Sequence, residues 1–340
     1  MPLSDLVFSD LLILPDGSGR LKGCPDSGQQ LVELPEEYAE EISDLPNKLT
    51  GAFLTSRRDP ETGARVGKTT IRFLHQGVHY RAADFEDVNG GRTWFLRRLP
   101  EKVPSLSTLG LPPYLCEWLL MRQQRHGLVL VAGAQASGKT TTASALVAGR
   151  LEHFGGHGVT FECPAELPLA GAWGEHGYCF QTEIDSEAEL AVHIERAHLY
   201  ASPNVIFIGE IHTRHAATES LRVAMGSRQQ LVVATIHGFD VQAALERLLN
   251  WARETDGANA AGHLANSLLA VIFQDLECEE RLQKVPQFLL LPFPYPGQSN
   301  ESLVRVQGTR AKLRSCQLHS LGDDMRQVKN IIGRDGLEAI

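Results

Sequence analysis

The sequence has no apolar run that approaches the roughly 18 residues of a membrane-spanning helix. Its opening segment, MPLSDLVFSD, carries acids where a secretory signal peptide carries basic residues. A basic excess is also missing, because 32 Lys+Arg stand against 41 Asp+Glu for a formal net charge of -9. These absences argue against a membrane-spanning, a secreted and a nucleic-acid-binding protein. We expect a cytoplasmic chain with protein partners and no nucleic acid.

Cysteine is sparse, with 6 residues in a chain of 340. The cysteines form no CxxC pair and do not stand at the Cys/His spacing of a zinc site. A disulfide framework and a structural zinc module are therefore not expected. We predict reduced thiols at Cys24, Cys116, Cys163, Cys179, Cys278 and Cys316.

What the sequence does contain divides it into two parts. In the first part, turn sequences such as Pro15-Asp16-Gly17 and Asn89-Gly90-Gly91 separate short alternating stretches, of which 70–80 is one. This pattern predicts a small antiparallel sheet domain. A Pro-bearing polar segment at 99–105 predicts the linker to a second domain.

From Leu128 onward, short apolar runs alternate with longer amphipathic stretches. The alternation predicts an α/β fold with a doubly wound, mostly parallel sheet, whose ligands bind at the carboxyl ends of the strands. The tail at 322–340 is charged and helical at most. The expected buried parallel strands are 128–132, 159–161, 205–208, 231–234 and 288–291, and the expected helices are 140–152, 187–200, 216–225, 241–252 and 260–274.

The segment GAQASGKT at 133–140 fits the pattern GxxxxGK[ST] between an apolar strand and a predicted helix. In such a loop, backbone N–H groups and the helix N-terminus surround the phosphates of a nucleotide. We expect Lys139 to reach the terminal phosphate and the Thr140 hydroxyl to bind Mg2+. The predicted nucleotide-binding residues are Gly133, Ala134, Gln135, Ala136, Ser137, Gly138, Lys139, Thr140 and Thr141.

A second segment, GARVGKT at 63–69, looks similar but is one residue too short between its glycines. It follows Arg57-Arg58-Asp59-Pro60 and not an apolar strand. We interpret it as a hairpin turn.

Two predicted strands end in acids that would suit the chemistry of a phosphate loop. The run VIFIGE ends at Glu210 in a Walker B arrangement, and the shorter run VTFE ends at Glu162. Because parallel strands share their carboxyl edge, both acids are expected near the γ-phosphate. We expect Glu210 to hold Mg2+ through water and Glu162 to orient the attacking water. The alternative for each is an acid at a loop entrance without a function.

The run at 231–234 continues into Thr235 and His237 at the same edge. His237 could bond a phosphate oxygen and report its presence. The alternative is a structural histidine at the end of a strand.

Four signatures in order, GAQASGKT, FECP, VIFIGE and ATIHG, resemble the secretion ATPase superfamily that drives type II secretion, type IV pili and type IV secretion, above all the PilT-like retraction ATPases. The resemblance implies a ring of six subunits that binds ATP and Mg2+. It implies a catalytic role for Glu162, a Walker B role for Glu210 and a functional role for His237.

The family resemblance also implies a PAS-like N-terminal domain at 1–104, a RecA-like ATPase core at 105–310 and a helical tail at 311–340. In this family the N-terminal domain supplies arginines to the nucleotide, and the sequence offers Arg81 and Arg97, with Arg92 as a weaker candidate. An arginine that arrives on domain closure would couple hydrolysis to motion. The alternative for each is a solvated strand charge.

This chain departs from the family at two positions: Cys163 stands where an Asp follows the catalytic Glu, and His212 stands where an Arg follows the Walker B Glu. A weakly active regulatory or scaffold subunit is therefore an alternative to a full motor. A monomeric P-loop kinase is a third reading, which the scarcity of arginines between Thr140 and Asn204 argues against.

The missing zinc module of extension-type ATPases and the short chain favour a retraction-type or plasmid-type ATPase, and an extension or conjugative secretion ATPase stays an alternative. The segment 328–335 faintly resembles the retraction motif of PilT-like proteins. The expected partners are further copies of the chain and an inner-membrane platform protein, through which the ring would associate with the membrane.

Overall fold

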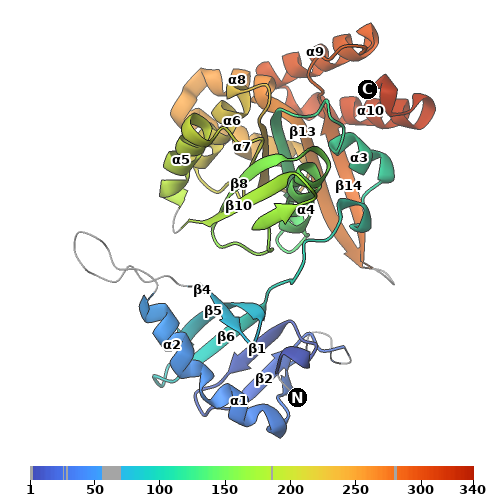
Figure 1. The fold of residues 1–340 in the computed structure, drawn as a ribbon. Helices are drawn as coiled ribbons and strands as arrows, with labels where there is room; N and C mark the ends of the chain where they lie inside the picture. Colours follow the sequence, from blue (N-terminus) through green and yellow to red (C-terminus); the bar gives the residue numbers. More distant parts are fainter. Residues whose placement is uncertain (1–2, 26, 28–29, 56–69, 185–186, 279–281) are drawn as a thin grey trace. The chain divides into compact units, whose positions relative to one another are not determined.

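The computed structural model describes the chain except for residues 1–2, 26, 28–29, 56–69, 185–186 and 279–281 (Figure 1). The hairpin expected at 63–69 lies outside the described residues. The chain separates into two compact units, Met1–Lys102 and Val103–Ile340.

The smaller unit is built on an antiparallel sheet of 6 strands in the order β3-β2-β1-β6-β5-β4. Residues alternate between buried and accessible along β5, where Val78, Tyr80 and Ala82 are buried, because successive side chains point to opposite faces. Helices α1 and α2 cover the buried face. The antiparallel sheet predicted for this part is confirmed. Its elements are β1 (Asp10–Ile13), β2 (Gly19–Lys22), β3 (Val32–Glu33), α1 (Ala39–Ser43), α2 (Leu45–Thr55), β4 (Ile71–His75), β5 (Val78–Glu86) and β6 (Arg92–Arg98).

The larger unit holds a sheet of 8 strands in the order β14-β13-β7-β12-β11-β8-β10-β9. The two edge strands are antiparallel to their neighbours and the strands between them are parallel. The strands are β7 (Gly127–Gly133), β8 (Gly156–Glu162), β9 (Gly171–Trp173), β10 (Gly177–Glu183), β11 (Val205–Ile208), β12 (Leu231–His237), β13 (Leu268–Cys278) and β14 (Leu282–Leu290).

Helices cover both faces of this sheet (Figure 1). Helices α3 and α4 and the body of α10 share one apolar core with it, and α5 to α9 share the other. The predicted doubly wound fold is confirmed. The helices are α3 (Pro113–Leu119), α4 (Lys139–Phe154), α5 (Glu187–Arg196), α6 (Arg214–Gly226), α7 (Val241–Asp256), α8 (Ala260–Ser267), α9 (Asn300–Arg314) and α10 (Leu321–Asp335).

Two predicted elements are wrong. The helix expected at 260–274 ends at Ser267, and β13 begins at Leu268. The run LLAVIF is apolar throughout, so periodicity does not separate helix from strand there, and its β-branched and aromatic residues fit the sheet. The strand expected at 288–291 is buried but antiparallel, because the segment between β13 and β14 is too short for a parallel crossover.

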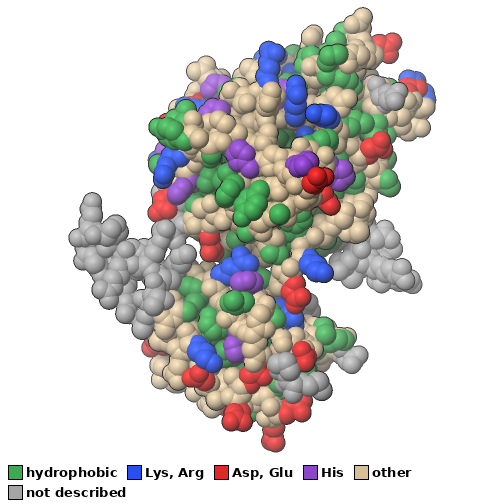
Figure 2. Space-filling view, in the orientation of Figure 1, with side chains coloured by type: hydrophobic (Ala, Val, Ile, Leu, Met, Phe, Trp, Pro, Cys, Tyr) green, Lys and Arg blue, Asp and Glu red, His purple; other side chains and the backbone are tan. Residues whose placement is uncertain are grey.

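The C-terminal helices are packed parts of the larger unit. The boundary expected at 310 falls inside α9, and Val328 and Ile332 of α10 are buried in the core beside α3 and α4. Among the helices described, none is long and apolar enough to cross a membrane. On the face in Figure 2, Lys and Arg side chains are scattered among acidic and apolar ones.

Candidate nucleotide-binding site

The phosphate loop lies where the sequence predicts it, between the end of β7 and the start of α4. Gly138 has φ 80° and caps the helix, a conformation that favours glycine. At Gly133 a Cβ would collide with the carbonyl oxygen of Gln274 and the hydroxyl of Ser137. The two glycines of the motif are thus required by backbone conformation and by close packing.

The Lys139 side chain is buried at this edge of the sheet. Its Nζ donates to Ala134 O at 2.8 Å and lies 3.3 Å from His237 Nδ1. Burial lowers the pKa of Lys139, while the charges of Glu210 and Glu166 act to raise it. The cation of the loop and the strand-end histidine are therefore in direct contact.

Glu210 continues this line of contacts. His237 Nε2 lies 2.9 Å from Glu210 Oε1 at ion-pair distance, and His212 Nε2 lies 3.2 Å from Oε2. Burial acts to raise the pKa of Glu210, but the hydrogen bond from His212 and the charges of His212, Lys139 and His237 lower it overall. Burial lowers the pKa of His237, against the opposing effect of Glu210. Glu210 is thus a carboxylate surrounded by basic groups.

Glu162 lies at the same edge, at the end of β8, and is 1% exposed. Strands β8 and β11 are in parallel register, and a Cβ at Gly209 would lie 3.3 Å from Glu162 Cγ. Burial raises the pKa of Glu162 to about 7, although hydrogen bonds from Gln181 and Thr160 act to lower it. The structure therefore brings Lys139, His237, Glu210 and Glu162 together along one edge, as the sequence predicts.

Thr235 takes no part in this line. Its hydroxyl donates to Gly209 O at 2.5 Å, and its carbonyl accepts from Ile211 N at 2.9 Å. These bonds fix the backbone on both sides of Glu210.

The predicted arginines lie on the sheet of the smaller unit. Arg81 of β5 stands directly opposite Arg97 of β6, and Arg72 of β4 stands opposite Arg81. Arg97 Nε donates to Asp10 Oδ1 at 2.9 Å. Like charges directly opposite one another on a sheet are unfavourable. Arg92, the weaker candidate, lies 3.3 Å from Asp84.

Gln274 of β13 is a residue that sequence reasoning missed. Its side chain is fully buried, accepts from Thr142 Oγ1 at 2.7 Å and donates to Ser137 O at 2.6 Å. It ties the phosphate loop to the first turn of α4. A polar residue inside the apolar run of β13 was the available signal, but the expected helix concealed its partners.

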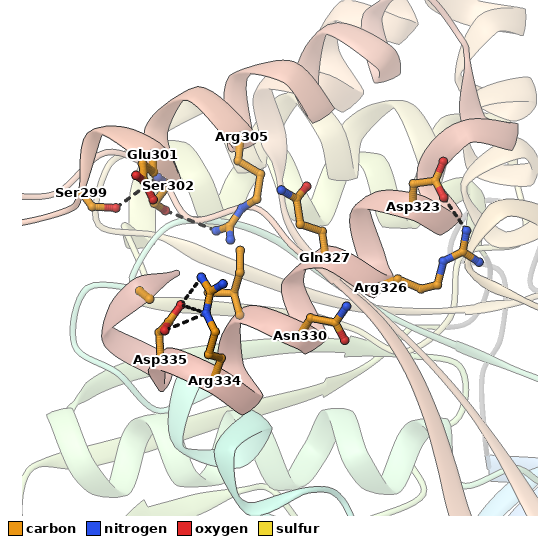
Figure 3. Close-up of a pocket in the computed structure, with 12 residues that line it drawn as sticks. Ser299, Glu301, Ser302, Arg305, Asp323, Arg326, Gln327, Asn330, Arg334 and Asp335 are labelled. Atoms are coloured by element: carbon orange, nitrogen blue, oxygen red, sulfur yellow. Dashed lines mark hydrogen bonds and ion pairs between the residues drawn. The ribbon is translucent and has the colours of Figure 1, made fainter.

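The hollow between α9 and α10, of about 670 Å³, contains none of the predicted site residues (Figure 3). Four of its charged side chains form two ion pairs, Arg326 with Asp323 and Arg334 with Asp335. The candidate site is therefore the edge of the sheet.

The fold and this edge define a P-loop nucleotide-binding protein of the doubly wound α/β class. The family model described as "Type II/IV secretion system protein" matches residues 55–320, more than half of the chain. The chain belongs to this family.

The chain is also similar in sequence to individual curated proteins. The chain is 33% identical over 204 residues to "Uncharacterized protein YggR" of Escherichia coli, covering 58% of each. It is 29% identical over 186 residues to "Type IV pilus ATPase PilU" of Pseudomonas aeruginosa, covering 53% of this chain and 45% of PilU. The chain thus spans about half the length of these curated relatives.

The fold is similar to that in the structure titled "Crystal Structure of the Pilus Retraction Motor PilT and Bound ADP", with TM-score 0.70 and 22% identity over 95% of this chain and 87% of that one. This likeness confirms the predicted fold class. ATPase is also the class that PilU carries in its name.

Proposed function

We propose that this chain hydrolyses ATP as a motor subunit of a type IV pilus or related secretion machine, with pilus retraction as its specific role. The observation that carries the proposal is the unbroken line of contacts from Lys139 through His237 to Glu210, beside the buried Glu162. A phosphate loop alone supports nucleotide binding. A carboxyl group with a pKa of about 7 next to a Walker B acid adds a candidate general base for hydrolysis.

In the proposed reaction, Glu162 accepts a proton from water as the water oxygen bonds to the γ-phosphorus. The bond from that phosphorus to the oxygen of ADP breaks, and the products are ADP and phosphate. Residues 133–141 hold the phosphates through backbone N–H groups and Lys139. Arg81 and Arg97 of the smaller unit are the further residues proposed to supply positive charge to the phosphates.

Thr140 and Glu210 are the residues that would hold Mg2+. Glu210 fits this role because it is a carboxylate beside the phosphate loop, in contact with His237, which in turn contacts Lys139. The described part of the chain contains no group of three or more His, Cys, Asp or Glu that could hold a metal by itself. A site shared with phosphate oxygens is the usual arrangement for Mg2+, which neutralises charge on the phosphates.

The proposed motor is a ring of six subunits that acts on an inner-membrane platform protein from the cytoplasmic side, as the family resemblance implies. The contact of His212 with Glu210 supports a second candidate, a regulatory subunit that binds nucleotide but turns it over weakly. The two candidates differ in turnover and agree in nucleotide binding.

The test is Mg2+-dependent phosphate release by the purified chain, with oligomeric mass measured in the presence of ATP. We expect Glu162→Gln to lower kcat by about 10²- to 10³-fold with ATP binding retained. Glu175→Gln, a change at an exposed glutamate, is the matched control and should leave kcat unchanged. Tight ATP binding with no phosphate release that depends on Glu162 would favour the regulatory subunit.

A further inference from the structure

The hydrogen bonds around Glu162 are divided unequally between its two oxygens. Oε1 accepts from Thr160 Oγ1 at 2.7 Å and from Gln181 Nε2 at 2.8 Å. Oε2 is buried, and among the described residues it has no hydrogen-bond partner. A buried carboxylate oxygen without a donor is costly, so this asymmetry calls for an explanation.

Both donors to Oε1 are themselves held in one orientation. The Thr160 hydroxyl accepts from Thr182 N at 3.3 Å, which directs its proton toward Glu162. Gln181 Nε2 also donates to Leu167 O at 2.7 Å, and Gln181 Oε1 accepts from Leu169 N at 3.1 Å and Ala170 N at 3.2 Å. The amide of Gln181 cannot turn over without losing these bonds.

We propose that Gln181 is a positioning residue for ATP hydrolysis, which together with Thr160 occupies Oε1 of Glu162 and reserves Oε2 to take the proton of the attacking water. The inference rests on the proposed function, because it assumes that Glu162 is the base. The proton passes from water to Oε2, and the water oxygen bonds to the γ-phosphorus as described above. Gln181 makes no contact with the reacting atoms and acts through Glu162.

Burial and the acids near Glu162 raise its pKa, and the hydrogen bonds from Gln181 and Thr160 oppose them. Glu166, in the loop after β8, and Glu183, at the end of β10, both act to raise the pKa of Glu162. The Cys179 thiol on β10 stays neutral, because burial raises its pKa to about 12. The described groups that act to lower the pKa of Glu162 are Gln181 and Thr160. Losing the donor of Gln181 therefore shifts the titration of Glu162 to higher pH.

Gln181→Glu removes the donor to Glu162 and places a second carboxyl group beside it, and both changes raise the pKa of Glu162. The new carboxyl group can still accept from Leu169 N and Ala170 N, although the bond from Gln181 Nε2 to Leu167 O is lost. We expect the acid limb of the kcat–pH profile to move up by about one pH unit or more. At neutral pH kcat should fall by about tenfold and recover in alkaline buffer. A purely structural role would lower kcat by the same factor at every pH.

Gln242→Glu is the matched control. Gln242 Nε2 donates to Glu246 Oε1 at 2.8 Å on the exposed surface of α7, so the same change breaks the same kind of bond away from the site. Its pH profile should match that of the unaltered chain. If Gln181→Glu does not fold, Thr160→Val removes the other donor and should shift the acid limb in the same direction.

The outcomes separate this inference from the proposed function. An unshifted acid limb in Gln181→Glu, in a chain whose activity Glu162→Gln abolishes, overturns the role of Gln181 and leaves the base intact. Full activity of Glu162→Gln overturns the base itself. A shifted acid limb with unchanged KM for ATP is the result that supports the inference.

Discussion

Glu162 ends β8 and Glu210 follows the end of the neighbouring parallel strand β11, yet the charges around the two acids are opposite in sign. Glu162 is bonded to a hydroxyl and an amide, with other acids nearby, and its pKa is raised to about 7. Glu210 lies among Lys139, His237 and His212, and its pKa is lowered. When their environments push the pKa values of two carboxyl groups apart, one group can accept a proton while the other stays ionised. The neighbours of each acid, and not its place on the sheet, therefore distinguish the two proposed roles.

The largest effects are expected when each of the two acids is neutralised in turn, which tests the difference between their roles. We expect Glu162→Gln and Glu210→Gln both to lower kcat by about 10²-fold or more. Only Glu210→Gln should raise the Mg2+ concentration needed for half-maximal activity, because Glu210 is the one of these two acids that we propose as a ligand of the ion. A phosphate-release assay titrated with MgCl2 at fixed ATP measures both effects. An equal Mg2+ response in the two variants would contradict the division of roles.

A second prediction concerns stability and pH. A carboxyl group with a pKa of about 7 in the folded chain and 4.5 in the reference state holds more protons when folded. Stability therefore falls as pH rises from 4.5 to 7, by up to about 3 kcal/mol at 1.36 kcal/mol per pKa unit. Glu162→Gln should remove this loss, so its stability relative to the unaltered chain should increase between about pH 5 and pH 8.

Urea unfolding without nucleotide, at about pH 5 and about pH 8, measures the change in the free energy of unfolding for both chains. The variant is compared with itself across pH, so any constant cost of the amide cancels. Glu175→Gln is again the control and should show no change with pH. A Glu162→Gln variant that keeps the full pH dependence of the unaltered chain would mean that Glu162 is ionised throughout.

These particular residues also show what the sequence could predict. Lys139, Glu162, Glu210 and His237 each follow an apolar run, so strand patterning and the parallel sheet rule bring them to one edge. Gln181 and Gln274 act through partners that are distant along the chain, and their role depends on strand register. The error at β13 concealed Gln274, since a residue assigned to a helix cannot be paired with the loop after β7. The pairing of Glu210 with His212 likewise needed the positions of the two side chains.

The smallest effect is expected at His212, where the contact with Glu210 is partly exposed. Its side chain is 48% exposed, and a salt bridge of this kind contributes about 0 to 1 kcal/mol. His212→Ala should therefore lower kcat by no more than about fivefold, because His237 still holds Glu210 from the other side. His212→Arg, which restores the residue type that the family resemblance implies at this position, should keep or raise kcat. If His212→Ala instead lowered kcat as much as Glu210→Gln does, His212 would be required for hydrolysis. Burial beside Lys139 and His237 would then not be enough to keep Glu210 ionised and in place.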